Sequence, residues 1–139
     1  MKMVIDTDVI VSSIRSTKGA SAELVRLARL EHFTIAISVP LVLEYEAKAT
    51  MEEHLAAGSI TRREALAVVD ALVAVGERTP AYFTYRPSVR DPDDEMILET
   101  AINAHADAIV TFNVRDFGNA PAKFAFECWS PLQALEKLR

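Results

Sequence analysis

The segment MVIDTD, residues 3–8, decides the fold of this chain. Its apolar part, Met3 to Ile5, is short and ends directly at Asp6, with Asp8 two positions later. A short apolar run bounded by polar residues is typical of a strand buried on both faces of a parallel sheet. We therefore expect a buried strand here, with two carboxylates placed just beyond its end.

Apolar runs and helical patterns alternate along the rest of the chain. The strands that we predict are Phe33–Ser38, Ala108–Thr111 and Phe124–Cys128, with a loop or short edge strand in Thr79–Arg90. We predict one helix after an N-cap at Ser21, and a second from Pro40 to about Ala57, which Gly58 ends. The capping box Thr61–Glu64 predicts the start of a third helix, which Gly76 ends. Two further helices are predicted to begin at Asp91–Pro92 and at Ser130–Pro131. This alternation predicts an α/β fold with a mostly parallel central sheet covered on both faces. Ligands bind such sheets beyond the carboxyl ends of the strands.

The composition limits the classes of protein to consider. With 139 residues, 50% of them hydrophobic, the chain has the size of one domain with one core, so we assign residues 1–139 to a single domain. Its one cysteine, Cys128, excludes an intrachain disulfide. No apolar run approaches the roughly 20 residues that cross a bilayer, and no secretory signal is recognisable. We expect a cytoplasmic protein without a membrane partner.

The charged residues point to a local rather than a general binding surface. Fifteen basic against twenty acidic side chains give a net charge of −5, which excludes a protein that coats nucleic acid through a broadly basic surface. The acids gather where the predicted strands end. They are Asp6 and Asp8 after the first strand, Glu44 and Glu46 after the second, Asp91, Asp93, Asp94 and Glu95 at the start of the helix that leads into the next, and Asp116, with Asn113, after that strand.

Such a convergence of carboxylates predicts a divalent cation. Carboxylates in one place repel one another unless a cation lies between them, and oxygen ligands suit Mg²⁺ or Mn²⁺ rather than Zn²⁺. We expect no zinc site, because His32, His54 and His105 are scattered along the sequence. A Mg²⁺ ion held by carboxylates lowers the pKa of a bound water and neutralises charge on a phosphodiester. The residues therefore favour hydrolysis of phosphodiester bonds.

Four segments carry a resemblance to a known family. They are VIDTDVIVSS (residues 4–13), LVLEYEAKA (41–49), DPDDEMILETA (91–101) and IVTFNVRDF (109–117). In this order and spacing they are similar to the motif blocks of PIN-domain nucleases, and the chain resembles the toxin components of VapBC-type toxin–antitoxin pairs. The resemblance implies a PIN-like three-layer α/β/α sandwich, a Mg²⁺ or Mn²⁺ cofactor, cleavage of single-stranded RNA and a small antitoxin partner. Dimers are common in the proteins it resembles, and the apolar stripe Leu66–Val73 offers one contact surface for a homodimer.

The resemblance also implies roles for individual residues. Asp6, Glu44 and Asp94 match three acidic positions of the family. Because Asn113 stands where many members have aspartate, we expect Asp116 to supply the fourth acid. The expected catalytic residues are thus Asp6, Glu44, Asp94 and Asp116; the expected metal ligands are Asp6, Asp94, Asp116 and Asn113; the expected supporting residues are Asp8, Thr111 and Arg115. Asp8 departs from the family, which often has asparagine there.

Each of these residues also has an ordinary structural explanation. Asp6 and Asp8 suit a turn after a strand, Asp91 and Asp93 suit the first turn of a helix, and Glu44 suits a solvated helix face. Among the basic residues, the first candidate for a contact with phosphate is Arg115. Arg86 and Arg90 come second, and Arg15 and Lys18 come third. Arg62 and Arg63 suit the solvated start of a helix.

Two other functions are compatible with the sequence. The triplet Asp6-Thr7-Asp8 mimics the nucleophile motif of HAD-like phosphatases, although the candidate lysine, Lys48, falls in a predicted helix rather than in a loop. A catalytically silent PIN module that binds RNA or a protein partner is the alternative outside the enzymes. The presence of all four acids argues against it.

Overall fold

Five parallel strands form the central sheet of the computed structural model, which describes residues 1–80 and 92–139 and, for residues 92 and 93, the backbone alone. The strands are β1 (Lys2–Ile5), β2 (Thr34–Ile37), β3 (Glu77–Arg78), β4 (Ala108–Val110) and β5 (Glu127–Trp129), and their spatial order is β3-β2-β1-β4-β5. In the central strand, Met3 lies opposite Ile35 of β2, and Ile5 lies opposite Val110 of β4.

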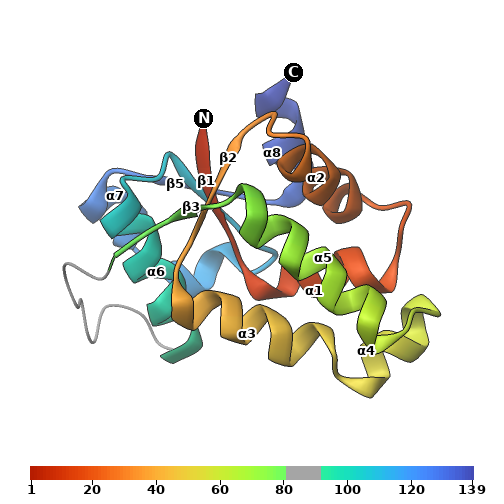
Figure 1. Cartoon of the computed structure of the whole chain (residues 1–139). Coiled ribbons are helices and arrows are strands. Elements are labelled where there is room, and N and C mark those ends of the chain that lie inside the picture. The colour runs from red at the N-terminus through yellow and green to blue at the C-terminus, as the bar shows by residue number, and fades with distance from the viewer. Residues whose placement is uncertain (81–91) are drawn as a thin grey trace.

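Helices cover both faces of this sheet. They are α1 (Thr7–Arg15), α2 (Ala20–Arg29), α3 (Val39–Ala49), α4 (Glu52–Gly58), α5 (Arg62–Val75), α6 (Pro92–Ala104), α7 (Ala120–Phe124) and α8 (Pro131–Leu138), with a 3₁₀ helix at Val114–Phe117. Figure 1 shows α6 and α7 on one side of the sheet and α1, α2, α5 and α8 on the other. The predicted three-layer α/β/α sandwich is confirmed. Within the described ranges, every helix is too short or too polar to cross a membrane.

The predicted first strand is the centre of the core. Met3, Val4 and Ile5 are completely buried. Helix α3 is tied to the end of this strand by Tyr45, whose fully buried hydroxyl donates a hydrogen bond to the carbonyl oxygen of Ile5. Because Ile5 directly precedes Asp6, this bond fixes α3 close to the acids that follow β1.

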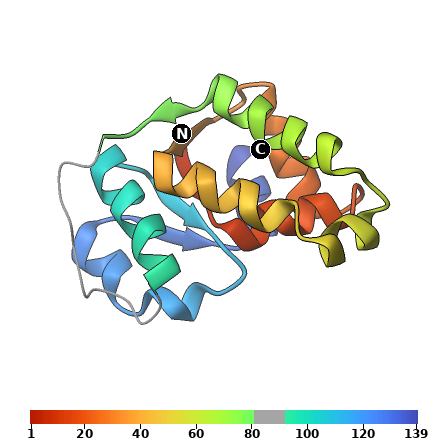
Figure 2. The same ribbon diagram turned by 60° about the horizontal axis from the view of Figure 1, so that its bottom comes forward.

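The backbone pairing of the strands continues one residue beyond β1 and β4. The N–H of Asp6 donates to the carbonyl oxygen of Val110 at 2.8 Å, and the N–H of Thr111 donates to that of Trp129 at 2.9 Å. Asp6 and Thr111 therefore lie on adjacent strand extensions at the carboxyl edge of the sheet. Helix α1 begins directly after Asp6, and Figure 2 shows α3 packed over it.

Two of the predicted capping signals are confirmed. Thr61 and Glu64 form a reciprocal capping box at the start of α5, and Gly76 ends that helix. Ser130 and Gln133 form a second capping box at the start of α8. These motifs satisfy backbone groups within one helical turn, so they act independently of tertiary packing.

The helix predicted from Pro40 to about Ala57 is two helices. Helix α3 ends at Ala49 and α4 begins at Glu52. The hydroxyl of Thr50 donates to the carbonyl oxygen of Glu46 at 2.8 Å, and such a side chain competes with the helical backbone bonds and bends or ends a helix. The break allows α4 to turn and pack against α1.

Three smaller differences concern other element boundaries. The N-cap of α2 is Gly19 rather than Ser21, which is buried within the first turn. Helix α7 extends to Phe124, so β5 begins only at Glu127. The edge strand β3 precedes Thr79, and most of the predicted loop Thr79–Arg90 lies outside the described residues.

The middle of the apolar stripe Leu66–Val73 faces inward. Val69 and Leu72 are completely buried, and α5 contacts α2, α3 and β2. Leu66 and Val73 are only partly buried, so a homodimer contact through this stripe stays a prediction. Helix α5 is amphipathic because the buried residues of this stripe pack into the core of the same chain.

Candidate active site

Asp6 and Thr111 form the buried base of the candidate site. The hydroxyl of Thr111 donates a hydrogen bond of 2.7 Å to Oδ2 of Asp6. Asp6 is only 8% exposed and Thr111 is completely buried. The same hydroxyl oxygen accepts a bond of 3.0 Å from the N–H of Asn113. Thr111 thus holds the carboxylate of Asp6 and also shapes the loop that follows β4.

Asp8 connects the first turn of α1 with that loop. Its Oδ2 accepts hydrogen bonds from the backbone N–H of Phe112 at 3.2 Å and from the side-chain amide of Asn113 at 2.9 Å. Its Oδ1 is buried without a hydrogen-bond partner. A buried carboxylate oxygen without a partner costs free energy of folding, so this oxygen is suited to bind a cation.

One open hollow of about 380 Å³ brings the predicted acids together. Its lining comes from α1, α3, α4, α6 and the segment after β4. The residues that line it are Asp6, Thr7, Asp8, Val11, Glu44, Lys48, His54, Asp94, Asn113 and Asp116. We call this the acidic hollow. It contains all four of the expected catalytic residues and all four of the expected metal ligands.

Burial, and to a lesser extent neighbouring negative charge, raises the pKa values of Asp6 at the N-cap of α1 and Asp8 in its first turn. Burial is the main cause of the raised pKa of Asp6, which the nearby charge of Asp116 raises further and the hydrogen bond from Thr111 partly lowers. Burial, followed by the charges of Asp6 and Asp94, raises the pKa of Asp8 to about 7. The environment of the hollow therefore disfavours the ionised forms of Asp6 and Asp8, and a bound cation would reverse this effect.

Glu44 is the acid of the hollow that has a basic neighbour within its own helix. Its Oε1 lies 3.8 Å from Nζ of Lys48, one helical turn later in α3. The Glu44 side chain is 20% exposed and that of Lys48 is 45% exposed. The carboxylate is therefore accessible from the hollow, and its charge is partly balanced before any ligand arrives.

The donor set of the hollow fits a hard divalent cation. Aspartate, glutamate and asparagine oxygens are the ligands that Mg²⁺ and Mn²⁺ prefer, and the unpartnered Oδ1 of Asp8 adds a further oxygen. In the described part of the chain, no three acidic, histidine or cysteine side chains are already close enough to hold one ion. The carboxylates would therefore have to draw together around the ion, which mutual repulsion prevents without one.

Other predicted residues lie elsewhere. Arg115 is exposed on the 3₁₀ helix and does not line the acidic hollow. Arg86, Arg90 and Asp91 lie outside the described residues, as does the side chain of Asp93. Glu46 does not line the hollow either.

Two basic residues of the hollow, Lys48 and His54, were not among the expected site residues. The spacing of Glu44 and Lys48, one turn apart on a helix, was a signal for Lys48. His54 belongs to α4, and only the turn between α3 and α4 brings that helix over α1. Local sequence patterns contain no signal for that approach.

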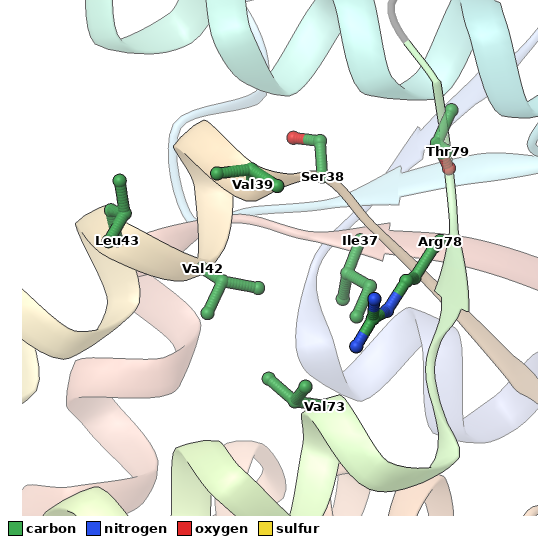
Figure 3. Close-up of a pocket in the computed structure, with 8 residues that line it drawn as sticks. All are labelled: Ile37, Ser38, Val39, Val42, Leu43, Val73, Arg78 and Thr79. Atoms are coloured by element: carbon green, nitrogen blue, oxygen red, sulfur yellow. The ribbon is translucent and has the colours of Figure 1, made fainter.

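A second hollow, of about 240 Å³, lies apart from the acids between β3, α3 and α5 (Figure 3). Its lining is mostly apolar, with Arg78 as its charged residue. The lining residues are Ile37, Ser38, Val39, Val42, Leu43, Val73, Arg78 and Thr79. No carboxylate lines this hollow, so it does not offer the chemistry of the acidic hollow.

Comparison with known families gives one match. A family model described as PIN domain matches residues 2–115. The matched range includes the acidic residues of the hollow except Asp116, which lies one position beyond its end. No curated protein matches the chain.

Proposed function

Because the chain belongs to the PIN-domain family, whose members are typically nucleases, we propose that it is a cytoplasmic Mg²⁺- or Mn²⁺-dependent endoribonuclease that hydrolyses phosphodiester bonds in single-stranded RNA. One observation carries this proposal: Asp6, Glu44, Asp94 and Asp116 line the same hollow at the carboxyl edge of the sheet. Four carboxylates from four separate segments have no evident structural purpose in one place, whereas together they suit a cation and a phosphodiester.

The roles that we assign follow from the environment of each side chain. Asp6, Asp94, Asp116 and Asn113 would hold the ion, with Asp8 adjacent. The chemistry that such an ion supplies when bound is acidification of a water and neutralisation of charge on the phosphate. Thr111 orients Asp6 through its hydrogen bond. Glu44, which is accessible and lies beside Lys48, is suited to accept the proton of the attacking water.

The toxin role and the antitoxin partner are part of the same proposal. They are supported by the resemblance of the four motif blocks to toxins of VapBC-type pairs. We expect expression of the chain to arrest growth, and co-expression of a small protein encoded beside it to relieve the arrest. Growth arrest that persists in the Asp6→Asn variant would separate the toxicity from nuclease activity and contradict the toxin assignment.

The decisive experiment is cleavage of a labelled single-stranded RNA with Mn²⁺ or Mg²⁺. We expect cleavage that is abolished by excess EDTA and lowered by about a thousandfold or more in Asp6→Asn, which keeps the shape of the side chain but removes its charge. Duplex RNA and single-stranded DNA of the same sequence test the substrate class. Asp70→Asn, an exposed position on α5, is the matched control and should cleave like the wild type.

The other two candidate functions have distinct outcomes in this experiment. A phosphatase would hydrolyse a phosphate monoester but leave the RNA intact; family membership argues against it. A silent PIN module would bind RNA without cleaving it. RNA cleavage that continues unchanged in excess EDTA, or in the Asp6→Asn variant, would overturn the proposed mechanism.

A further inference from the structure

We propose that Arg15, His54 and Lys48 form a phosphate-binding wall on the α4 side of the acidic hollow, which holds the RNA backbone next to the phosphodiester that is cleaved. This inference rests on the proposed function, because it assigns a place to the RNA substrate. His54 and Lys48 would contact the phosphate directly. Arg15 is a positioning residue for His54 and adds positive charge to the wall.

The contact between Arg15 and His54 determines which face of the imidazole is available. Nη1 of Arg15 lies 2.8 Å from Nδ1 of His54. A guanidinium has donors only and stays charged, so Nδ1 must accept this bond and carry no proton. In the neutral ring the proton therefore lies on Nε2. Arg15 thus holds His54 as an N–H donor, which is the form that binds a phosphate oxygen.

Helix α1 links this wall to the acids. Asp8 and Val11 line the acidic hollow, and Arg15 follows them on the same helix at spacings of three and four residues, which places all three on one face. The seven residue steps from Asp8 to Arg15 correspond to about 10 Å along the helix axis. An RNA strand that enters the acidic end can therefore continue along α1 toward the basic end.

The charge distribution favours an RNA backbone that runs from the acidic residues toward the basic ones. The chain carries a net charge of −5, so it gains little general attraction for RNA and needs a local cationic surface. Among the described residues that line the acidic hollow, Lys48 and His54 are the basic ones. The side chain of Lys48 is 45% exposed and its ammonium lies beside Glu44, so it can reach a ligand in the hollow.

A purely structural role for the Arg15–His54 contact makes different predictions. The contact joins α1 to α4. If it served only to hold these helices together, its loss would lower the stability of the protein without changing RNA affinity at a temperature where the protein is folded. We therefore measure binding of a fluorescein-labelled single-stranded RNA by anisotropy, with Ca²⁺ in place of Mn²⁺ to prevent turnover. Unfolding by urea is measured in parallel for every variant.

We expect His54→Ala and Arg15→Ala each to weaken RNA binding by about tenfold, the effect of one hydrogen bond that involves a charge. Lys48→Ala should reduce the slope of log affinity against log salt by about 0.7, since one charged phosphate contact is lost. In cleavage, KM should rise while kcat changes little. The controls are His32→Ala and Arg29→Ala, which are exposed and do not line the hollow; both should bind like the wild type.

A pair of conservative variants tests the assigned tautomer. The amide nitrogen of glutamine takes nearly the place of Nε2, whereas that of asparagine takes nearly the place of Nδ1. His54→Gln should therefore keep most of the RNA affinity, and His54→Asn should lose as much as His54→Ala. Nitrogen NMR of the His54 ring should show the proton on Nε2 in the wild type and a mixture of tautomers in Arg15→Ala.

The outcomes separate this inference from the proposed function. If the wild type cleaves RNA but His54→Ala and Arg15→Ala bind RNA as tightly as it does, the phosphate-binding wall is wrong and the nuclease assignment stands. If the wild type binds RNA in a manner that depends on His54 but does not cleave it, the nuclease assignment fails and the wall stands. A wild type that does not bind RNA overturns both.

Discussion

The hydroxyl of Thr111 lies 2.7 Å from Oδ2 of Asp6, although 105 positions separate the two residues in the sequence. The parallel pairing of β1 and β4 creates this contact, because each residue extends its strand by one position. Thr111 donates to the carboxylate and accepts from the N–H of Asn113 at 3.0 Å. One buried hydroxyl therefore fixes the central acid and the loop that carries Asn113 and Asp116.

Thr111→Val should weaken both the fold and the reaction. Valine keeps the volume but leaves Oδ2 of Asp6 without its side-chain donor, so the free energy of unfolding should fall by about 1–3 kcal/mol. RNA cleavage should fall by about 10–100-fold, as is usual when the partner of a metal ligand is lost. Urea unfolding and steady-state kinetics measure the two effects. Thr111→Ser keeps the hydroxyl and should restore most of the activity; wild-type cleavage by Thr111→Val would contradict the orienting role.

The metal-free protein should lose stability as the pH rises from about 4 to about 7. Burial foremost, and then the charges of Asp6 and Asp94, raise the pKa of Asp8 to about 7. A carboxyl group whose pKa is higher in the folded than in the unfolded state stabilises the fold fully below the unfolded pKa. That contribution is lost as the pH rises through the folded pKa. Urea unfolding in EDTA at a series of pH values measures the effect.

Asp8→Asn isolates the contribution of this carboxyl group. The amide keeps an acceptor for Phe112 and Asn113 but does not titrate in this range, so the pH dependence should become flatter than in the wild type. Mn²⁺ should stabilise the wild type more at the upper end of the range than at the lower end, because the ion binds ionised carboxylates. Identical pH profiles for the wild type and Asp8→Asn would show that the Asp8 carboxyl group does not carry the effect.

The sequence predicts those features that depend on local pattern. The run Met3–Ile5 predicts β1, because a strand buried on both faces must be apolar throughout. The capping box Thr61–Glu64 predicts the start of α5, because its bonds lie within one turn. The sequence does not predict helix α1, because more than half of its residues are β-branched and few favour a helix. Packing against α2 and α3 decides their conformation.

The candidate site is predictable in position but not in its interactions. Parallel strands bring their carboxyl ends to one edge, so Asp6 and the residues after β4 are expected to meet. The two bonds that Asp8 accepts from Phe112 and Asn113 depend on the exact path of a loop. The approach of His54 to Arg15 depends on the break between α3 and α4. No local pattern encodes either distance.

Asp116, more than Asn113, should supply the fourth acidic function. The charge of Asp116 acts on Asp6, whereas the side-chain amide of Asn113 donates a hydrogen bond to Asp8. Asp116→Asn should therefore lower both the affinity for Mn²⁺ and the rate of RNA cleavage, and Asn113→Ala should affect them less. Isothermal titration with Mn²⁺ and single-turnover cleavage compare the two variants. If Asn113→Ala is the more damaging change, the neutral side chain is the working ligand and the assignment to Asp116 is wrong.

Gly58→Ala should destabilise the protein and disturb the basic end of the acidic hollow. A Cβ atom at position 58 would lie 2.1 Å from the carbonyl oxygen of Ile14 and 2.8 Å from the side chain of Ile60. The first contact is with backbone, so α4 must move away from α1. Alanine gains up to about 1 kcal/mol of helix propensity over glycine, but overpacking against backbone costs about 1–3 kcal/mol or more. The net change should be a lower midpoint of urea unfolding.

Gly19→Ala is the matched control for this change, because its Cβ would meet only the hydroxyl of Ser16 at an ordinary 3.9 Å. The shift of α4 in Gly58→Ala should also lengthen the contact between Arg15 and His54, which now measures 2.8 Å. RNA affinity should then fall in Gly58→Ala, as in His54→Ala, while Mn²⁺ affinity stays near that of the wild type because the acids lie on other elements. Wild-type stability and RNA affinity in Gly58→Ala would mean that the close approach of α4 to α1 neither limits the fold nor positions His54.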